Sequence, residues 1–214
     1  NISTLTINGW TITYNNTKNL SLTTTSGNIT YSDPEGDYIK ANNLKIISSS
    51  AIGTSSNYIL FNAYSLYIEA QGAVYIKATP IPPANLVDFC KVVTPANIYI
   101  ETLEGSIRVG TIISTSGSVS IISAGYILQN TSLQGRIQAA LNSVLKALGG
   151  TVGTYNQALR VYMPGNVTLT IYASMSDNDR AANLYDPDNT LSWDELLYEE
   201  GSAYYIYYND ERKP

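Results

Sequence analysis

The sequence predicts an all-β fold of short strands, either a β-solenoid or a β-sandwich, with one amphipathic helix at about residues 134–148. Three observations lead to this prediction. Apolar and polar residues alternate over many short runs, which is the period of a half-buried strand. A similar unit recurs at intervals of roughly 22 residues between residues 19 and 128, as stacked repeats require. The segment at 134–148 has instead the residue spacing of an amphipathic helix.

Residues 1–18 are expected to form an N-terminal strand that is distinct from an all-β domain at 19–214. Apolar residues alternate between residues 3 and 14, and Asn8-Gly9 in the middle allows a bulge or a tight turn. Such a terminal segment can complete the sheet of a neighbouring chain by strand addition. The alternative is an ordinary edge strand of the same domain. The residues of this candidate assembly strand are Leu5, Ile7, Trp10, Ile12 and Tyr14.

Residues 19–128 carry the repeats, and an Asn or Ser opens each unit of two short strands. The opening residues are Asn19, Asn43, Ser65, Asn97 and Ser118. Successive gaps between them are 24, 22, 32 and 21 residues, and the long gap contains the Pro-rich segment 79–95. The spacing favours a β-solenoid, in which each coil buries its apolar face against the next coil. A sandwich of β-hairpins would show the same alternation, so the pattern does not distinguish the two architectures.

The segment LQGRIQAALNSVLKALGG, at 133–150, is the best helix candidate, and Gly149-Gly150 would end the helix. Such a helix could cap the open end of a solenoid or lie across a sheet. The apolar residues of its buried face would be Ile137, Leu141, Val144, Leu145 and Leu148.

Residues 155–214 are expected to contain the C-terminal strands. The runs at 158–163 and 166–174 are joined by Pro164-Gly165 and predict a β-hairpin. The Tyr-rich run at 203–208 predicts the last strand, which could also pair with a neighbouring subunit.

An acidic segment lies between these strands and contains two D-x-D patterns, whose oxygen atoms could bind Ca²⁺. The full EF-hand pattern fails because Leu191 occupies the position of the invariant glycine. We therefore interpret the patterns as Asp-rich turns, and we expect no metal and no other cofactor. The weak calcium candidates are Asp177, Asp179, Asp186 and Asp188.

The composition excludes several classes of function. The chain has 214 residues, no His and one Cys, so a Ser-His-Asp triad, an imidazole metal ligand and an intrachain disulfide are all excluded. Net charge is −5, and the 12 basic residues are scattered singly apart from the adjacent Arg212 and Lys213, which argues against nucleic-acid binding. Charged residues make up only 14%, against about 25% in ordinary soluble domains. Few side chains therefore remain that could carry out catalysis.

Two carboxylates and one thiol are the remaining chemical candidates. Glu69 and Glu101 follow the same motif, in SLYIE and NIYIE, and could stack on neighbouring coils. A polysaccharide-cleaving solenoid would need such a pair, whereas in an inert solenoid both are surface charges. Cys90 lies in the apolar run LVDFCKVV, and no His is present to activate it. We expect Cys90 to be a buried structural thiol and the protein not to be an enzyme.

The chain begins at Asn1 and not at methionine, so we expect either a removed leader or a fragment. It contains no apolar run of about 18 residues, so no transmembrane helix is expected. A removed signal peptide would place the protein outside the cell, where N-x-S/T sites are candidates for glycosylation. These candidate acceptors are Asn1, Asn15, Asn19, Asn28, Asn130 and Asn166.

The repeats SLYIEAQGAVYIKA, NIYIETLEGSIRVG and STSGSVSIIS resemble the β-solenoid regions of secreted haemagglutinin-type and adhesin domains. This resemblance covers residues 19–128, implies a non-catalytic surface protein, and transfers no functional residue. In composition and in its alternating N-terminal strand, the whole chain is also similar to subunits of archaeal extracellular threads and bundling pili. In those filaments an N-terminal tail completes a β-sandwich of the next subunit.

Taken together, these observations predict a secreted, non-enzymatic structural subunit of an extracellular filament or adhesive layer. Its expected partners are copies of itself, joined as a homopolymer by β-strand addition, with surface glycans as a second class of partner. The alternatives are a monomeric glycan-binding adhesin module and a polysaccharide-cleaving β-helix enzyme.

Overall fold

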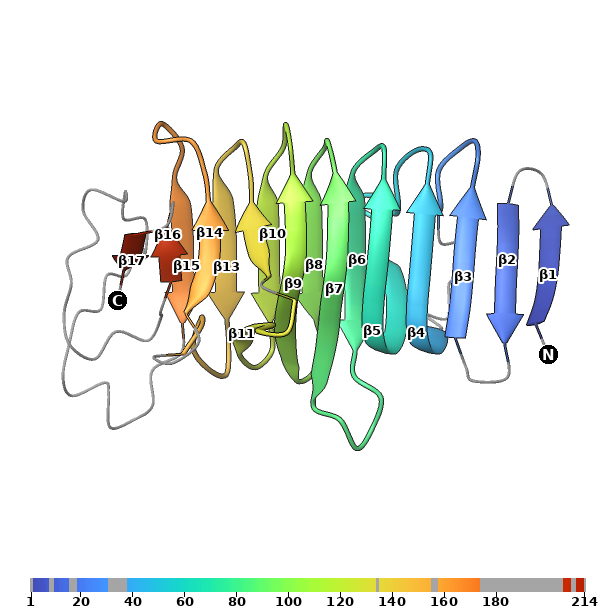
Figure 1. Cartoon of the computed structure of the whole chain (residues 1–214), viewed down its shortest axis with the longest axis horizontal. Helices are drawn as coiled ribbons and strands as arrows, with labels where there is room; N and C mark the ends of the chain where they lie inside the picture. Colours follow the sequence, from blue (N-terminus) through green and yellow to red (C-terminus); the bar gives the residue numbers. More distant parts are fainter. Residues whose placement is uncertain are drawn as a thin grey trace.

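The computed structural model folds the chain into an all-β solenoid of about six turns (Figure 1). The structure describes residues 2–7, 10–15, 19–30, 38–133, 135–154, 158–173, 206–208 and 211–213. Within these residues there is no helix. The all-β prediction is confirmed, and of the two predicted architectures the solenoid is the correct one.

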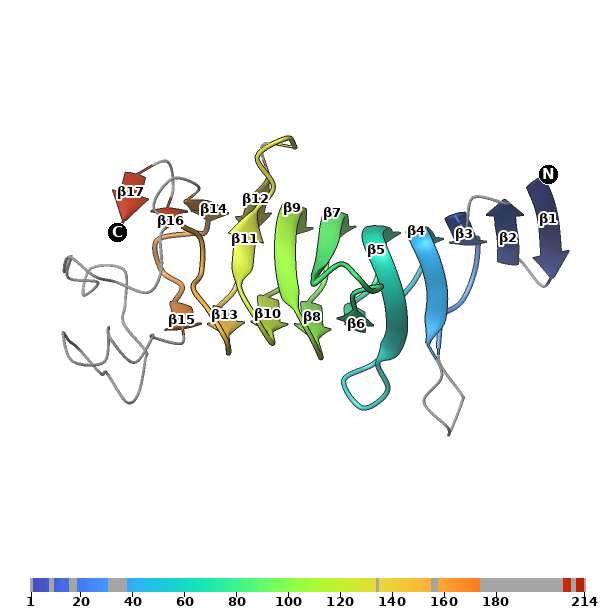
Figure 2. The same ribbon diagram turned by 90° about the horizontal axis from the view of Figure 1, so that it is seen from below.

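Each coil contributes strands to two parallel sheets that face one another across the core (Figure 2). Sheet 1 contains β3 (Asn19–Thr24), β4 (Ile39–Ser48), β5 (Ile59–Ala70), β7 (Leu86–Thr94), β9 (Ser106–Ser114), β11 (Ile127–Gln129), β12 (Arg136–Gln138), β14 (Leu159–Tyr162) and β16 (Ile206–Tyr208). Sheet 2 contains β6 (Val74–Thr79), β8 (Ile98–Thr102), β10 (Val119–Ser123), β13 (Ser143–Ala147) and β15 (Leu169–Ala173). The long strands β4 and β5 cross from one sheet to the other. Their first residues belong to sheet 2, because residues 39–41 pair with residues 61–63, and residues 59–62 pair with residues 76–79 of β6. At the two ends of sheet 1, antiparallel strands are added: β1 (Ile2–Ile7) and β2 (Trp10–Asn15) at one end, and β17 (Glu211–Lys213) at the other.

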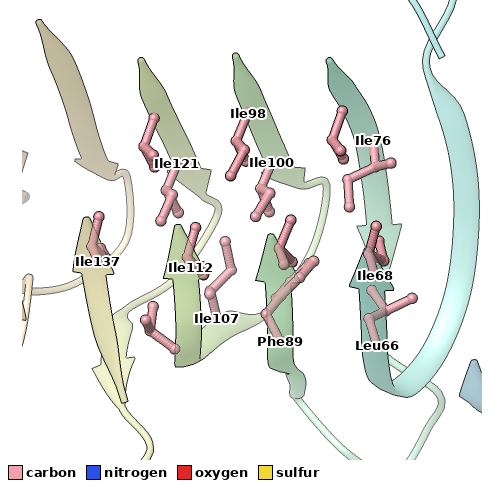
Figure 3. Close-up of a cluster of buried hydrophobic side chains, with 14 of the residues drawn as sticks. Leu66, Ile68, Ile76, Phe89, Ile98, Ile100, Ile107, Ile112, Ile121 and Ile137 are labelled. Atoms are coloured by element: carbon pink, nitrogen blue, oxygen red, sulfur yellow. The ribbon is translucent and has the colours of Figure 1, made fainter. Parts of the chain in front are cut away.

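The core consists of columns of aliphatic side chains that run along the solenoid axis (Figure 3). One column of sheet 1 contains Leu22, Ile46, Ile68, Val92, Ile112, Ile137 and Val161. A column of sheet 2 faces it and contains Ile76, Ile100, Ile121, Leu145 and Ile171. Each fully buried side chain of this size contributes about 2 kcal/mol to stability. Because identical register positions stack in every coil, the alternation seen in the sequence becomes a continuous core.

Polar residues that open the repeats also stack, and they form hydrogen bonds between coils. Asn43 Nδ2 donates to Asn19 Oδ1 at 2.7 Å, and Ser65 Oγ donates to Asn43 Oδ1 at 2.6 Å. In a second column, the backbone N–H of Ser118 donates to Asn97 Oδ1 at 3.0 Å. These ladders fix the register of adjacent coils, since a shift by one residue would break every bond.

The two ladders explain the irregular 32-residue gap between the repeats. Ser65 pairs with Asp88 in sheet 1, whereas Asn97 precedes β8 in sheet 2, so they occupy different corners of the coil. The 32-residue gap is therefore measured between two different ladders, and it does not correspond to the length of one coil. Strand β7 takes up most of the Pro-rich segment 79–95, and it pairs with β5 and β9, so this segment belongs to the solenoid. Proline is tolerated there because Pro80, Pro82 and Pro83 lie in the loop before the strand and Pro95 follows its last residue.

The predicted helix at about 134–148 is wrong. This part of the chain forms β12 and β13, which pair in parallel with β9 and β10. Ile137 and Leu145 are fully buried in strands, whereas Leu141 and Leu148 are exposed at turns. The residues fit both a helical and a strand period, and the open edge of the preceding coil decides between them because it offers backbone hydrogen bonds to a strand.

The predicted β-hairpin at 158–163 and 166–174 is also wrong. Strand β14 pairs with β12 and β16, and β15 pairs with β13, so the two strands lie in different sheets. The turn at Pro164-Gly165 leads the chain from sheet 1 to sheet 2. A turn signal indicates a change of direction, but the available sheet edges decide which strands pair.

Candidate assembly and binding surfaces

The segment predicted as a single assembly strand forms two strands, β1 and β2. Strand β1 pairs antiparallel with β2, and β2 pairs antiparallel with β3 of the same chain, so the segment is a hairpin at the end of sheet 1. The predicted single N-terminal strand at 1–18 is thereby corrected. The backbone register aligns Leu5 with Ile12 and Ile12 with Leu22, which continues the core column of sheet 1 in the sequence. The other assembly residues align as Ile7 with Trp10, and Tyr14 with Leu20.

Sheet 1 is longer than sheet 2 at this end. The first ladder positions opposite sheet 1 are Ile29 and Ile52, which bridge to each other and then to Val74 of β6. Among the described residues, no strand lies opposite β1 or β2 (Figure 2). Likewise, in this part of the chain the outer edge of β1 has no pairing strand. The end of the solenoid therefore presents an unpaired strand edge, which is a template for pairing with another chain.

At the opposite end, part of the Tyr-rich segment forms the expected strand. Strand β16 pairs in parallel with β14 and antiparallel with β17, and Ile206 is fully buried. The remainder of the run, at 203–205, lies outside the described residues. Sheet 1 thus ends in an antiparallel strand at both ends of the solenoid.

The expectation that Glu69 and Glu101 stack is wrong. Glu69 lies on β5 in sheet 1, where its register neighbour is Val93, and Glu101 lies on β8 in sheet 2, where it pairs with Lys77. The same apolar-x-apolar motif occurs in strands of both sheets, so sequence similarity alone did not identify the column. Each carboxylate instead forms an ion pair with a lysine of an adjacent strand.

Glu69 is the centre of a charged cluster on sheet 1. It accepts hydrogen bonds from Tyr67 Oη at 2.6 Å and from Lys91 Nζ, and Lys91 Nζ also lies 3.1 Å from Tyr67 Oη. Lys45 Nζ lies 5.3 Å from the centre of the Tyr67 ring. The hydrogen bond from Lys91, followed by that from Tyr67, lowers the pKa of Glu69. The same bond raises the pKa of Lys91.

We expect Glu69→Gln to lower the free energy of unfolding at neutral pH by less than about 1 kcal/mol, because the pair is partly exposed to solvent. The folded-state pKa is lowered, so this contribution is present above the unfolded pKa near 4.5. It is lost as the pH falls through the folded pKa. Chemical denaturation at neutral and at acidic pH should show that the difference between the two proteins disappears in acid.

Glu104→Gln is the matched control, since Glu104 is exposed and has no salt bridge among the described residues. A pH-independent loss of stability in Glu69→Gln would contradict the assigned ion pair.

Glu101 is part of an aromatic cluster on sheet 2. Tyr99 Oη donates to Glu101 Oε2 at 2.8 Å, and Lys77 Nζ lies 2.9 Å from the same oxygen. The Tyr99 ring packs 5.0 Å from the Tyr58 ring and 6.5 Å from the Tyr75 ring. Burial, and secondly the Glu101 carboxylate, raise the pKa of Tyr99. The cluster packs the loop that carries Tyr58 onto the sheet, which is a structural role.

A further polar network spans three coils, with Asp88 in β7, Arg108 in β9 and Asn130 directly after β11. Asn130 Nδ2 donates to both carboxylate oxygens of Asp88, at 3.0 and 3.1 Å. Arg108 Nε lies 3.4 Å from Asp88 Oδ2, which is an ion-pair distance without hydrogen-bond geometry. Asn130 is only 6% exposed, so the nitrogen that would carry a glycan is already bonded inside the fold.

The other predicted glycosylation sites differ in accessibility. Asn28 and Asn166 are exposed at turns, whereas Asn19 is half-buried in its ladder. Asn15 ends β2, and Asn1 lies outside the described residues. Accessibility thus favours Asn28 and Asn166 as acceptors.

A groove of about 260 Å³ crosses β3, β4 and β5 on the outer surface of sheet 1. Its polar and aromatic lining includes Asn19, Asn43, Lys45, Ser65 and Tyr67. Lys45 is exposed and supplies a cation, and the Tyr67 ring supplies a flat apolar surface, which are groups that can contact a sugar.

Cys90 lies at the far end of this groove, at a bulge in β7. Phe89 pairs with Leu66 and Lys91 pairs with Tyr67, so Cys90 has no ladder partner on β5. The thiol is half-buried, and burial followed by the nearby Asp88 carboxylate raises its pKa. A raised pKa leaves the thiol poorly nucleophilic, consistent with the expected structural role.

In the described part of the chain, no group of three or more His, Cys, Asp or Glu residues could hold a metal ion. The weak calcium candidates Asp177, Asp179, Asp186 and Asp188 lie outside the described residues. No helix in that same part has the length and hydropathy needed to cross a membrane.

Comparisons with protein-family models, with curated proteins and with solved structures found no match to this chain. The resemblance to adhesin repeats and to filament subunits therefore stays a prediction.

Proposed function

We propose that the protein is a non-enzymatic structural subunit of an extracellular filament or adhesive cell-surface layer. Copies join end to end when the N-terminal hairpin of one solenoid adds to the sheet of the next. The observation that carries this proposal is the extension of sheet 1, by β1 and β2, beyond the first described strand position of sheet 2.

Two properties of the hairpin support the proposal. Its register aligns apolar residues with the core column that contains Leu22 and Ile46, yet the structure describes no opposite strand that would complete a coil. The free edge of β1 also leaves backbone donors and acceptors for another strand. A second copy can supply both the missing apolar layer and the missing hydrogen bonds.

Deletion of residues 1–18 tests the proposal. We expect the truncated chain to remain folded, because the coils from β3 onward form their own core, and to lose filament formation. Circular dichroism reports the fold, and negative-stain microscopy with sedimentation reports the assembly. Filaments of unchanged length and number in the truncated protein would overturn the proposal.

A pair of double variants separates the apolar contact from the strand edge. Leu5→Ser with Ile7→Ser changes the apolar positions of β1, where Leu5 aligns with the core column and Ile7 aligns with Trp10. Thr4→Ser with Thr6→Ser changes the intervening positions. We expect the first double variant to reduce assembly strongly and the second to assemble as the unmodified protein does.

The second candidate function is a monomeric glycan-binding module, and the groove at Lys45 and Tyr67 favours it. It predicts that glycan binding survives deletion of residues 1–18 and is lost in Tyr67→Ala. The polysaccharide-cleaving alternative has lost its proposed residue pair, since Glu69 and Glu101 are ion-paired on different sheets.

A further inference from the structure

Five large apolar side chains are exposed in the described part of the chain, and three of them lie in turns at the same edge of the solenoid. The five are Leu103 (41% exposed), Tyr126 (45%), Leu133 (48%), Leu141 (50%) and Leu148 (53%). Leu103, Tyr126 and Leu148 lie in the turns that follow β8, β10 and β13, which are neighbouring strands of sheet 2. We call these three residues the apolar ridge. The turns that carry it follow one another along the edge of the solenoid that is lowest in Figure 1.

The ridge protrudes because its neighbours in the turns are small. Gly105, Gly125 and Gly149 accompany the three large side chains. The only charged residue in these turns, at 103–105, 124–126 and 148–150, is Glu104. A surface without basic residues does not attract an anionic membrane or a polyanion. The chemistry of the ridge therefore fits an uncharged protein surface.

A groove of about 320 Å³ is lined by residues at the turns that follow β9, β12 and β14. The turns after β9 and β14 lie along the opposite edge of the solenoid (Figure 1). Ala139 and Met163, which are almost fully buried, are among its lining residues. The others are uncharged and both polar and apolar: Ser114, Thr115, Gln138, Ala140, Tyr162 and Pro164. No charged residue is among its lining residues. We call this the edge groove.

The edge groove and the apolar ridge belong to the same three coils. In each of the three coils the chain passes a ridge turn, crosses sheet 1 and then passes a groove turn. The ridge turns precede β9, β11 and β14, and the groove turns follow β9, β12 and β14. A sideways translation of one solenoid, without rotation, therefore brings a ridge against a groove with all three coils in register. Leu141, exposed beside Ala140, adds apolar surface next to the groove.

We propose that copies of this chain pack side by side, with the apolar ridge of one copy inserted into the edge groove of the next. The contact is heterologous, because each copy contributes its ridge to one neighbour and its groove to the other. Such a contact, related by translation, forms an open array and not a closed ring. Such repetition forms a flat layer or a bundle of parallel solenoids. The proposal goes beyond the end-to-end contact, and it uses none of residues 1–18.

Sedimentation of full-length single-site variants tests the lateral contact. We expect Leu148→Ser, in the ridge, and Thr115→Arg, at the exposed mouth of the groove, each to weaken lateral association at least about tenfold. The matched controls are Leu133→Ser, an equally exposed leucine away from the ridge, and Ser116→Arg, an exposed neighbour outside the groove lining. Both controls should associate as the unmodified protein does.

A mixing experiment tests the direction of the contact. The double variant Leu103→Ser with Leu148→Ser keeps an intact groove, and Thr115→Arg keeps an intact ridge. Each variant alone should show no lateral association. An equimolar mixture should form one-to-one lateral pairs and no larger lateral assemblies. A ridge-to-ridge contact would not be rescued by mixing. Unaltered association of Leu148→Ser and Thr115→Arg, absence of pairs in the mixture, or a failure of the unmodified protein to associate laterally would each overturn the proposal.

The lateral and the end-to-end contacts fail separately. The chain without residues 1–18 should still associate laterally, and the ridge variants should still form single filaments under the microscope. If the deletion abolishes filaments and leaves lateral association unchanged, the result supports the end-to-end contact and leaves the lateral contact unaffected.

Discussion

Replacing Leu145 by alanine is expected to lower the free energy of unfolding by about 3 kcal/mol. Leu145 is fully buried in β13, between Ile121 and Ile171 of the neighbouring coils, so its removal leaves a cavity that parallel strands on both sides cannot close. Chemical denaturation monitored by circular dichroism, with the unmodified protein in parallel, measures this loss.

Two other leucines of the same segment provide the control. Leu141→Ala and Leu148→Ala should each change the free energy of unfolding by less than about 0.5 kcal/mol, because both side chains are exposed at turns. In an amphipathic helix the three leucines would share one face and cost similar amounts. Equal losses at the three positions would therefore contradict the strand and restore the helix.

Gly110→Ala is expected to cost about 3 kcal/mol, or to prevent folding of the central coils. A Cβ atom at Gly110 would overlap the backbone oxygen of Cys90 and would lie 2.8 Å from that of Phe89. Both contacts are with the main chain of β7, so a side-chain rotation cannot relieve them. Thermal and chemical denaturation of the purified variant measure the cost.

Gly165→Ala is the matched control for that substitution. Nothing lies within 4 Å of a Cβ atom at Gly165, so we expect a change of less than about 0.5 kcal/mol. A Gly110→Ala protein as stable as the Gly165→Ala protein would mean that β9 and β7 are not in close contact at the Cys90 bulge.

Part of the candidate site could be predicted from the sequence, and part could not. The alternation between residues 3 and 14 predicted strand structure, and the structure has strands there. The hairpin at Asn8-Gly9 was only one of two options, because the same pair also allows a bulge. The apolar ridge was missed, since Leu148 was assigned to a buried helical face. A usable signal was present, because a large apolar residue within two positions of a glycine recurs at Leu103, Tyr126 and Leu148.

By itself, the sequence determined which residues face the core within a strand and where the polar corners occur. Ile98 and Ile100, or Val119 and Ile121, are buried at alternate positions because side chains in a strand point to opposite faces. Only the tertiary structure decided which strands are neighbours. It separated Glu69 from Glu101, placed Ser65 and Asn97 at different corners, and made residues 143–147 a strand. The physical reason is that alternation is a local property of the backbone, whereas pairing depends on which sheet edge the preceding coil leaves open for hydrogen bonds.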